Sequence, residues 1–233
     1  MRDWAGRRYW LLGADTPLGA ALALKLSRAG VELVLSGRDQ GRLEDLTVSL
    51  PGRSSYIPLD ITRPDQLDGV AIELGTVDGM VYASDLNVAS GLDGPPGASA
   101  RMVSETLLGL CHALDLVLPG LRERGGHVVM LDSLTSITGL PGQAGHGAAK
   151  AGVRVMAEAL RAEAPGGRVS VQLVTLCGAD AATAAAGIFE HMGTTRFRRS
   201  VPAAAGLLVR AAHLLPGWLM RPAIATLTKR AQD

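Results

Sequence analysis

The stretch from Tyr9 to Arg28 reads YWLLGADTPLGAALALKLSR and decides the fold class. It opens on a short apolar run, Tyr9 to Leu12, which is typical of a buried strand. It closes on a segment in which apolar residues recur at helical spacing. Between the two lies a glycine-bounded turn, Gly13-Ala14-Asp15-Thr16-Pro17-Leu18-Gly19. A strand, a tight turn and a helix in this order predict the first unit of a parallel α/β sheet.

The same alternation continues along the chain. Further strands are predicted at residues 31–36, 55–59, 77–83, 127–131 and 169–176, and helices at 40–50, 99–124 and 144–164, the second of these bending near Pro119. Crossover helices imply a parallel sheet covered on both faces. We therefore predict one Rossmann-type, doubly wound α/β domain over residues 1–233. Its core is expected at about residues 8–177, followed by a lid and C-terminal segment at about 178–233.

Composition excludes several classes of protein. The 233 residues suit one domain, and a net charge of +1 gives no field that attracts nucleic acid or an anionic membrane. Aromatic residues, at 3%, are too few for a single-strand stacking platform. Cys111 and Cys177 form neither a metal motif nor a disulfide framework. The apolar run after the polar N-terminus is too short for a signal peptide, so we expect a cytoplasmic protein without stable membrane insertion or a metal.

The turn between the first strand and helix is a candidate phosphate site. Gly13 permits the tight turn, and Gly19 lets the helix approach the sheet. The helix start at Thr16 and Leu18 offers unpaired N–H groups and the positive end of the helix dipole. Two glycines alone are a weak signal, because an ordinary strand–turn–helix junction needs them too.

Two charged residues follow the next strands. Arg38, after the second strand, can pair with the 2′-phosphate of NADP, and its alternative is a solvated surface arginine. Asp60 follows the third strand, where its carboxylate can read an adenine amino group or merely hold a turn. Together with the glycine turn, the two residues favour a bound dinucleotide.

Two later stretches carry a family resemblance. Residues 126–133 read GHVVMLDS and residues 142–153 read GQAGHGAAKAGV. With the glycine turn, Arg38 and Asp60, this order resembles the short-chain dehydrogenase/reductase family over about residues 8–177. The resemblance implies an NADP(H) cofactor and a small-molecule substrate. It also places Ile61 and Ser84, after the third and fourth strands, at the cofactor site, and implies pairing of the two long helices into a homodimer or homotetramer.

The resemblance assigns the reaction site as well. Ser133 takes the place of the serine that binds the substrate carbonyl, and Lys150 that of the lysine that holds the nicotinamide ribose. His146 stands where the family has its catalytic tyrosine, and Thr106 where it has a helix asparagine. His146 and Lys150 are four residues apart, so they share one helix face. An imidazole exchanges protons near neutral pH, and a nearby Lys150 favours its neutral form. The bland alternatives are a serine bonding local backbone and a solvated lysine.

Other family positions differ too. Pro17 replaces the middle glycine and removes one N–H donor, which a helix start tolerates. The segment after the fourth strand reads Tyr82-Ala83-Ser84-Asp85, and Leu176-Cys177 replaces a Pro-Gly. Three functions remain open: an NADP(H)-dependent reductase using His146, a non-redox cyclase, dehydratase or isomerase using His146 for proton transfer, and an inactive binding or scaffolding subunit.

The remaining segments give weaker indications. Residues 178–193 are rich in Ala, Thr and Gly and suggest a mobile cover over the site. Leu207 to Leu215 is expected to be helical, and the apolar segment within Leu207–Met220 to form a substrate lid or subunit contact rather than a membrane hairpin. We expect His112 to be a surface or interface residue. A last set, expected to form a solvated loop, comprises Arg196, Arg198 and Arg199.

Overall fold

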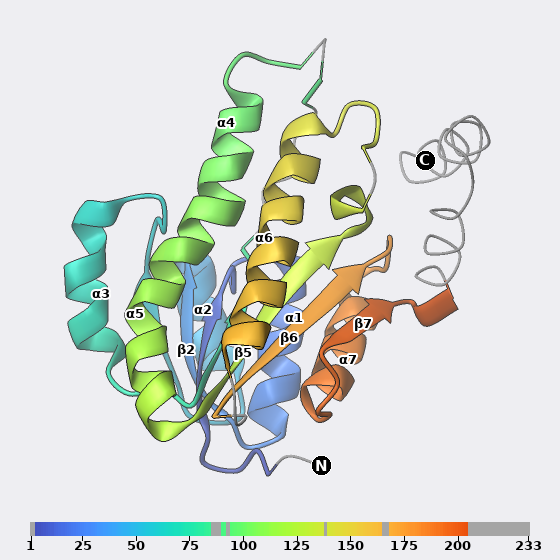
Figure 1. The fold of residues 1–233 in the computed structure, drawn as a ribbon. Helices are drawn as coiled ribbons and strands as arrows, with labels where there is room; N and C mark the ends of the chain where they lie inside the picture. Colours follow the sequence, from blue (N-terminus) through green and yellow to red (C-terminus); the bar gives the residue numbers. More distant parts are fainter. Residues whose placement is uncertain (1–2, 85–89, 92–93, 138, 165–167, 205–233) are drawn as a thin grey trace.

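The computed structural model describes residues 3–84, 90–91, 94–137, 139–164 and 168–204. Its centre is one seven-stranded sheet in the order β3-β2-β1-β4-β5-β6-β7, and every neighbouring pair is parallel. Helices cover both faces of this sheet (Figure 1). The predicted doubly wound α/β fold is therefore confirmed.

The elements follow the predicted alternation closely. The strands are β1 Arg8–Leu12, β2 Glu32–Gly37, β3 Ser54–Pro58, β4 Gly79–Tyr82, β5 Gly126–Ser133, β6 Val169–Leu176 and β7 Arg198–Val201. The α-helices are α1 Pro17–Arg28, α2 Gln40–Ser49, α3 Leu67–Leu74, α4 Ala98–Val103, α5 Gly109–Arg124, α6 Ala144–Glu163 and α7 Ala181–Met192. Single turns at Pro64–Gln66, Ser104–Leu108 and Leu134–Ser136 complete the described part.

The strand order places the candidate site. The chain runs from β1 outward to β3, then returns to pair β4 with the other side of β1. The loops after β1 and β4 therefore leave the sheet in opposite directions and open a crevice at their carboxyl ends. Ligands of open α/β sheets bind in such a crevice.

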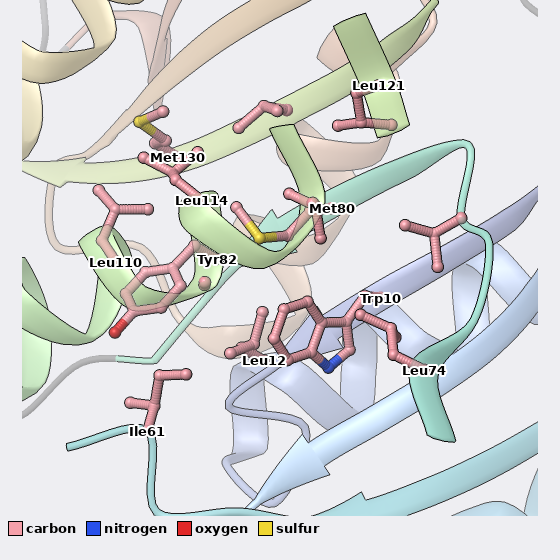
Figure 2. Close-up of a cluster of buried hydrophobic side chains, with 14 of the residues drawn as sticks. Trp10, Leu12, Ile61, Leu74, Met80, Tyr82, Leu110, Leu114, Leu121 and Met130 are labelled. Atoms are coloured by element: carbon pink, nitrogen blue, oxygen red, sulfur yellow. The ribbon is translucent and has the colours of Figure 1, made fainter. Parts of the chain in front are cut away.

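Each face of the sheet has its own hydrophobic core. One core joins β-strand side chains such as Trp10 and Met80 to α3, α5 and α6 (Figure 2). The other joins Leu11 and Leu35 to α1, α2 and α7. Strands buried on both faces explain the continuous apolar runs in the sequence, because neither side of such a strand meets water.

The expected mobile cover at residues 178–193 is wrong for most of its length. Residues Ala181–Met192 form α7, which packs against α1, and the side chains of Ile188 and Met192 are fully buried. Its small residues serve close packing instead. A Cβ on Gly187 would lie 2.6 Å from a methyl group of Val201. The Ala- and Gly-rich composition therefore reflects a tight helix–sheet contact.

The long helical pattern contains an irregular turn that the sequence did not indicate, and the bend expected near Pro119 stays a prediction. The helical run 98–124 includes a π-helical turn, Ser104–Leu108, between α4 and α5, whereas Pro119 lies inside α5. This run is long and apolar enough to cross a membrane, but the core helices of soluble proteins often meet the same two criteria. In its most apolar stretch, 44% is buried inside the protein.

The basic cluster is a solvated loop only at Arg196, which is exposed and precedes β7. Arg198 and Arg199 lie on β7, an edge strand, and pair with Glu158 and Glu190 respectively. Charged residues are common on edge strands because they discourage pairing with another chain. The segment Leu207–Met220, for which a helix and a lid or subunit contact were expected, lies outside the described residues.

Candidate active site

The turn after β1 forms a tight cradle. Gly13 has a φ of +78°, and a Cβ there would lie 2.8 Å from the backbone of Ala83. Gly19 sits so close to the turn that its Cβ would lie 2.0 Å from the carbonyl oxygen of Gly13. Both positions accept only glycine without a backbone shift. The two glycines therefore let this turn pack closely against the segment after β4 and against the start of α1.

The first helix begins as the sequence indicates. The Thr16 hydroxyl accepts a hydrogen bond from the Gly19 N–H at 3.0 Å and donates one to the Gly13 carbonyl at 2.7 Å. Pro17 is the first helical residue, where a missing N–H costs no helical hydrogen bond. The N–H of Leu18 lies in the same first turn and has no partner within the helix. The N–H of Thr16 donates to the Gly13 carbonyl at 3.2 Å, so the helix start offers the Leu18 N–H and a positive dipole end.

Asp15 ties this turn to the end of β2, a role that the sequence did not reveal. Its carboxylate accepts hydrogen bonds from the backbone N–H groups of Arg38 at 2.9 Å and Asp39 at 3.1 Å. A Cβ on Gly37 would overlap this carboxylate at 2.2 Å. The loop that carries Arg38 is therefore fixed against the glycine turn.

Arg38 extends into the crevice and pairs with two carboxylates. Its guanidinium lies 2.7 Å from Glu105 and 3.6 Å from Asp60. Burial lowers the pKa of Arg38, but the hydrogen bond and charge of Glu105, aided by Asp60, outweigh it and the pKa is raised. One hollow is lined by five predicted residues, together with Asp15 and Glu105: these are Gly13, Thr16, Arg38, Ile61 and Ser84.

The turn after β3 closes this hollow. Asp60 accepts hydrogen bonds from the N–H and the hydroxyl of Thr62, at 3.0 and 2.7 Å. Both bonds go to one carboxylate oxygen, Oδ1, which therefore holds the turn, as one of the two expected roles of Asp60 required. Burial raises the pKa of Asp60, but these bonds and the charge of Arg38 lower it overall. His112 is half-buried, and its ring bonds the Ile61 carbonyl through Nδ1 at 2.8 Å and steadies the turn; its place at a surface or interface stays a prediction.

The three residues assigned to the reaction lie where β5 meets α6. Ser133 ends β5, and its hydroxyl accepts a long bond from the Thr135 N–H at 3.4 Å, which caps the turn Leu134–Ser136. The first turn of α6 lies against this segment, because a Cβ on Gly147 would sit 3.1 Å from the Thr135 carbonyl. His146 is in that first turn and is 3% exposed.

Lys150 is buried, which rules out the solvated alternative. Its side chain is 2% exposed, and its ammonium donates to the Leu131 carbonyl on β5 at 3.1 Å. Asp132, next along β5, is buried as well and accepts bonds from the Ser133 N–H at 2.8 Å and the Thr175 hydroxyl at 3.2 Å. Burial raises the pKa of Asp132, although a bond from Ser136 and the charge of Lys150 oppose the shift.

Thr106 lies in the π-helical turn and is fully buried. Among the described residues its hydroxyl oxygen has no hydrogen-bond partner. The π turn packs on α6, because a Cβ on Gly152 would lie 2.6 Å from Leu107. Thr106 therefore lies on the helix beside the one that carries His146 and Lys150. Within the described ranges, no three His, Cys, Asp or Glu side chains gather as a metal ion would require.

Sequence reasoning missed three acidic residues here: Asp15, Glu105 and Asp132. Asp15 lies inside the glycine turn, Gly13–Gly19. An acidic residue beside a candidate phosphate site is unusual, and this could have indicated that Asp15 has a structural role. Asp132 stands directly before Ser133 in an otherwise apolar strand. Glu105 gave no signal, because its place depends on a π turn that brings residue 105 opposite the end of β2.

Comparisons with known proteins agree with this geometry. The family model for short chain dehydrogenase matches residues 9–191. The BbsC subunit of (2S)-[(R)-hydroxy(phenyl)methyl]succinyl-CoA dehydrogenase from Thauera aromatica is 30% identical over 76% of this chain and 74% of its own length.

Two solved structures share the fold. A short chain dehydrogenase from Burkholderia cenocepacia in complex with NADP has a TM-score of 0.82 at 21% identity, covering 91% of this chain and 94% of its own. A short chain dehydrogenase/reductase from Burkholderia phymatum in complex with NAD has a TM-score of 0.83 at 19% identity, covering 91% and 95%. The chain belongs to the short-chain dehydrogenase family. It is an oxidoreductase of that family, and the predicted membership and enzyme class are confirmed.

Proposed function

We propose that this protein is an NADP(H)-dependent oxidoreductase acting on a carbonyl or hydroxyl group of a small organic substrate in the cytoplasm, with His146 as the acid/base. One observation carries the proposal: Gly13, the helix-capping Thr16 and Arg38 line a single hollow at the carboxyl end of β1. Titration of the purified protein with NADPH, NADP, NADH and NAD tests it, and failure to bind any of them would refute it.

The chain's residues fit a dinucleotide. Gly13 and Thr16 line the hollow beside the start of α1, and the N-terminus of this helix suits the pyrophosphate. Ile61 and Ser84 line the same hollow and would contact the adenosine and the part of the dinucleotide that follows it. When bound, the cofactor supplies or accepts the hydride.

Arg38 supports NADP(H) over NAD(H). Solved structures of the family hold either cofactor, so fold alone does not choose between them. A guanidinium after the second strand can form charge-assisted hydrogen bonds with a 2′-phosphate, whereas an acidic residue there would bind the ribose hydroxyls. The residue that follows Gly37 is this arginine.

The chain's own groups at the β5–α6 junction would handle the proton. Ser133, at the end of β5, would hold the substrate oxygen through its hydroxyl. His146 would give a proton to that oxygen during reduction and take it during oxidation. Lys150 would hold the ribose and hold a positive charge near His146, and Thr106 would support the neighbouring helix turn. The low exposure of His146 and Lys150 supports a site from which water is excluded.

The relative from Thauera aromatica bears on the substrate. Its name describes the dehydrogenation of a hydroxyl-bearing acyl-CoA. This supports an alcohol or ketone as the reacting group here.

Replacing Arg38 with alanine should weaken NADPH binding by about 1.5–3 kcal/mol, the range for a hydrogen bond to a charged group. NADH binding should change little, because it has no 2′-phosphate. Calorimetric titration of both cofactors measures the difference. Arg63→Ala, which removes an exposed arginine paired with Asp65, is the matched control. An equal loss for both cofactors would show that Arg38 does not meet the 2′-phosphate.

We also propose a homodimer or homotetramer built on the two long helices. Leu108, at the π turn, is 47% exposed and Val155, on α6, is 65% exposed. Apolar side chains on helix faces are stabilised when a symmetry mate covers them. Light scattering should show an oligomer for the wild-type protein. The double substitution Leu108→Glu and Val155→Glu should dissociate it, whereas the control Ile72→Glu on α3 should not. A monomeric wild-type protein at micromolar concentration would contradict this.

A further inference from the structure

The ion pair between Arg38 and Glu105 spans the hollow proposed for the cofactor. Arg38 comes from the loop after β2, and Glu105 comes from the π turn between α4 and α5. Their side chains meet at 2.7 Å, and the Glu105 side chain is only 9% exposed. Both residues line the hollow that contains Gly13. The guanidinium proposed for the 2′-phosphate is therefore already held by a buried carboxylate.

The backbone fixes Glu105 in this position. The Tyr82 hydroxyl donates a hydrogen bond of 2.5 Å to the Glu105 carbonyl oxygen. Gly109, after the π turn, packs so closely that a Cβ there would lie 2.5 Å from the same hydroxyl. The carboxylate can turn about its side-chain bonds, but its Cα cannot leave the hollow without breaking these contacts.

The other charges nearby do not take over the role of Glu105. Asp60 is engaged by Thr62, and Asp15 is engaged by backbone N–H groups. Arg101 lines an adjoining hollow beside Glu105 and adds a second cation. Among the carboxylates of the described residues, Glu105 thus lies closest to the Arg38 guanidinium, at 2.7 Å against 3.6 Å for Asp60.

We propose that Glu105 is a specificity-determining residue that competes with the 2′-phosphate for Arg38 and so reduces the preference for NADP(H) over NAD(H). This inference rests on the proposed cofactor site. To bind the phosphate, Arg38 must leave or share Glu105, and a buried carboxylate without its cation is costly. The added phosphate also repels that carboxylate. NAD(H) carries a hydroxyl there, so the ion pair can remain.

The direct test is Glu105→Gln, which keeps the shape of the side chain and removes its charge. The dissociation constant for NADPH should fall about ten-fold, as expected when a competing charge-assisted hydrogen bond is lost. That for NADH should stay within about two-fold, because its hydroxyl does not compete for Arg38. Glu123→Gln, an exposed site at the end of α5, makes the same charge change outside the hollow and should alter neither constant.

A second background shows that the effect passes through Arg38. In Arg38→Ala protein, Glu105→Gln should give no selective gain for NADPH. Adenosine 2′,5′-bisphosphate and AMP, as probes of the adenosine half alone, should reproduce the selective gain in the Glu105→Gln protein. If that variant unfolds, Glu105→Ala, which removes both charge and bulk, replaces it.

The outcomes separate this inference from the proposed function. If wild type binds NADPH and Glu105→Gln leaves that affinity unchanged, or strengthens both cofactors equally, the role of Glu105 is refuted and the cofactor site stands. If neither protein binds any of the four dinucleotides, the proposed function fails and this inference fails with it. A ten-fold weaker binding of NADH to Glu105→Gln would instead make Glu105 a direct ligand of the adenosine.

Discussion

His146→Ala should lower turnover by roughly 10²–10⁴-fold, the usual contribution of a general acid or base, and leave cofactor affinity within about two-fold. The imidazole lies in the first turn of α6, against the segment that follows Ser133, and is 3% exposed. Bulk solvent has little access to a side chain with so low an exposure, so the loss of the imidazole should not be made good by bulk water. Cofactor affinity should persist, because the cradle and Arg38 belong to other segments.

Steady-state kinetics with cofactor titration measures both effects. Gln143→Ala, just before α6, changes a polar residue in the same neighbourhood and should keep most of the activity. Thermal unfolding of both variants separates a lost proton carrier from a lost fold. Full activity in His146→Ala protein would remove this residue from the mechanism and leave Ser133 or a bound water as the proton carrier.

His146→Tyr distinguishes the three functions that the sequence left open. In a reductase related to tyrosine enzymes, a phenol at this helix position should preserve or increase hydride transfer. In a non-redox enzyme built around imidazole, the same change should abolish the reaction, and the larger ring would fill space used by the substrate. In an inactive scaffold, the change should alter stability alone.

The sheet was predictable because its signal is local. Runs such as Tyr9 to Leu12 are apolar throughout, as is typical of strands covered on both faces, and each is followed by a helical period. β7 escaped prediction because an edge strand carrying Arg198 and Arg199 has no such run. The helix α7 escaped because alanine and glycine indicate both flexibility and close packing, and only the contact with α1 and Val201 decides between them.

The candidate site divides in the same way. The glycine turn, Ser133 and the His146–Lys150 pair each lie within a short stretch, so the family resemblance of those stretches was enough to assign them. Arg38 and Glu105 are far apart in sequence, and a π turn brings Glu105 to Arg38. The periodicity of apolar residues in the sequence does not predict such a turn. Spacing also could not show that Lys150 points to the Leu131 carbonyl, since that depends on how closely α6 packs on β5.

Trp10→Ala should destabilise the protein by about 3–5 kcal/mol, the range for removing a large buried aromatic side chain. Trp10 is fully buried in central strand β1, between Val34 on β2 and Met80 on β4 (Figure 2). Since domains are stable by only about 5–15 kcal/mol, this loss would remove a large share of the total. Urea unfolding measures it, and Val48→Ala at an 84% exposed position should cost little.

Trp10 is also connected to the candidate cofactor site by hydrogen bonds through Ser36. The Trp10 ring N–H donates to the Ser36 hydroxyl at 2.9 Å, and the Ser36 carbonyl accepts from the Gly13 and Ala14 N–H groups at 2.8 and 3.0 Å. Trp10→Phe keeps a ring but leaves a buried hydroxyl unpaired, which costs about 1–3 kcal/mol. Adding Ser36→Ala should recover part of that loss, because both partners are then gone. If Trp10→Ala lowers the free energy of unfolding by less than about 1.5 kcal/mol, the neighbouring side chains must fill the space left by the indole ring. Trp10 would then not be needed to position the glycine turn.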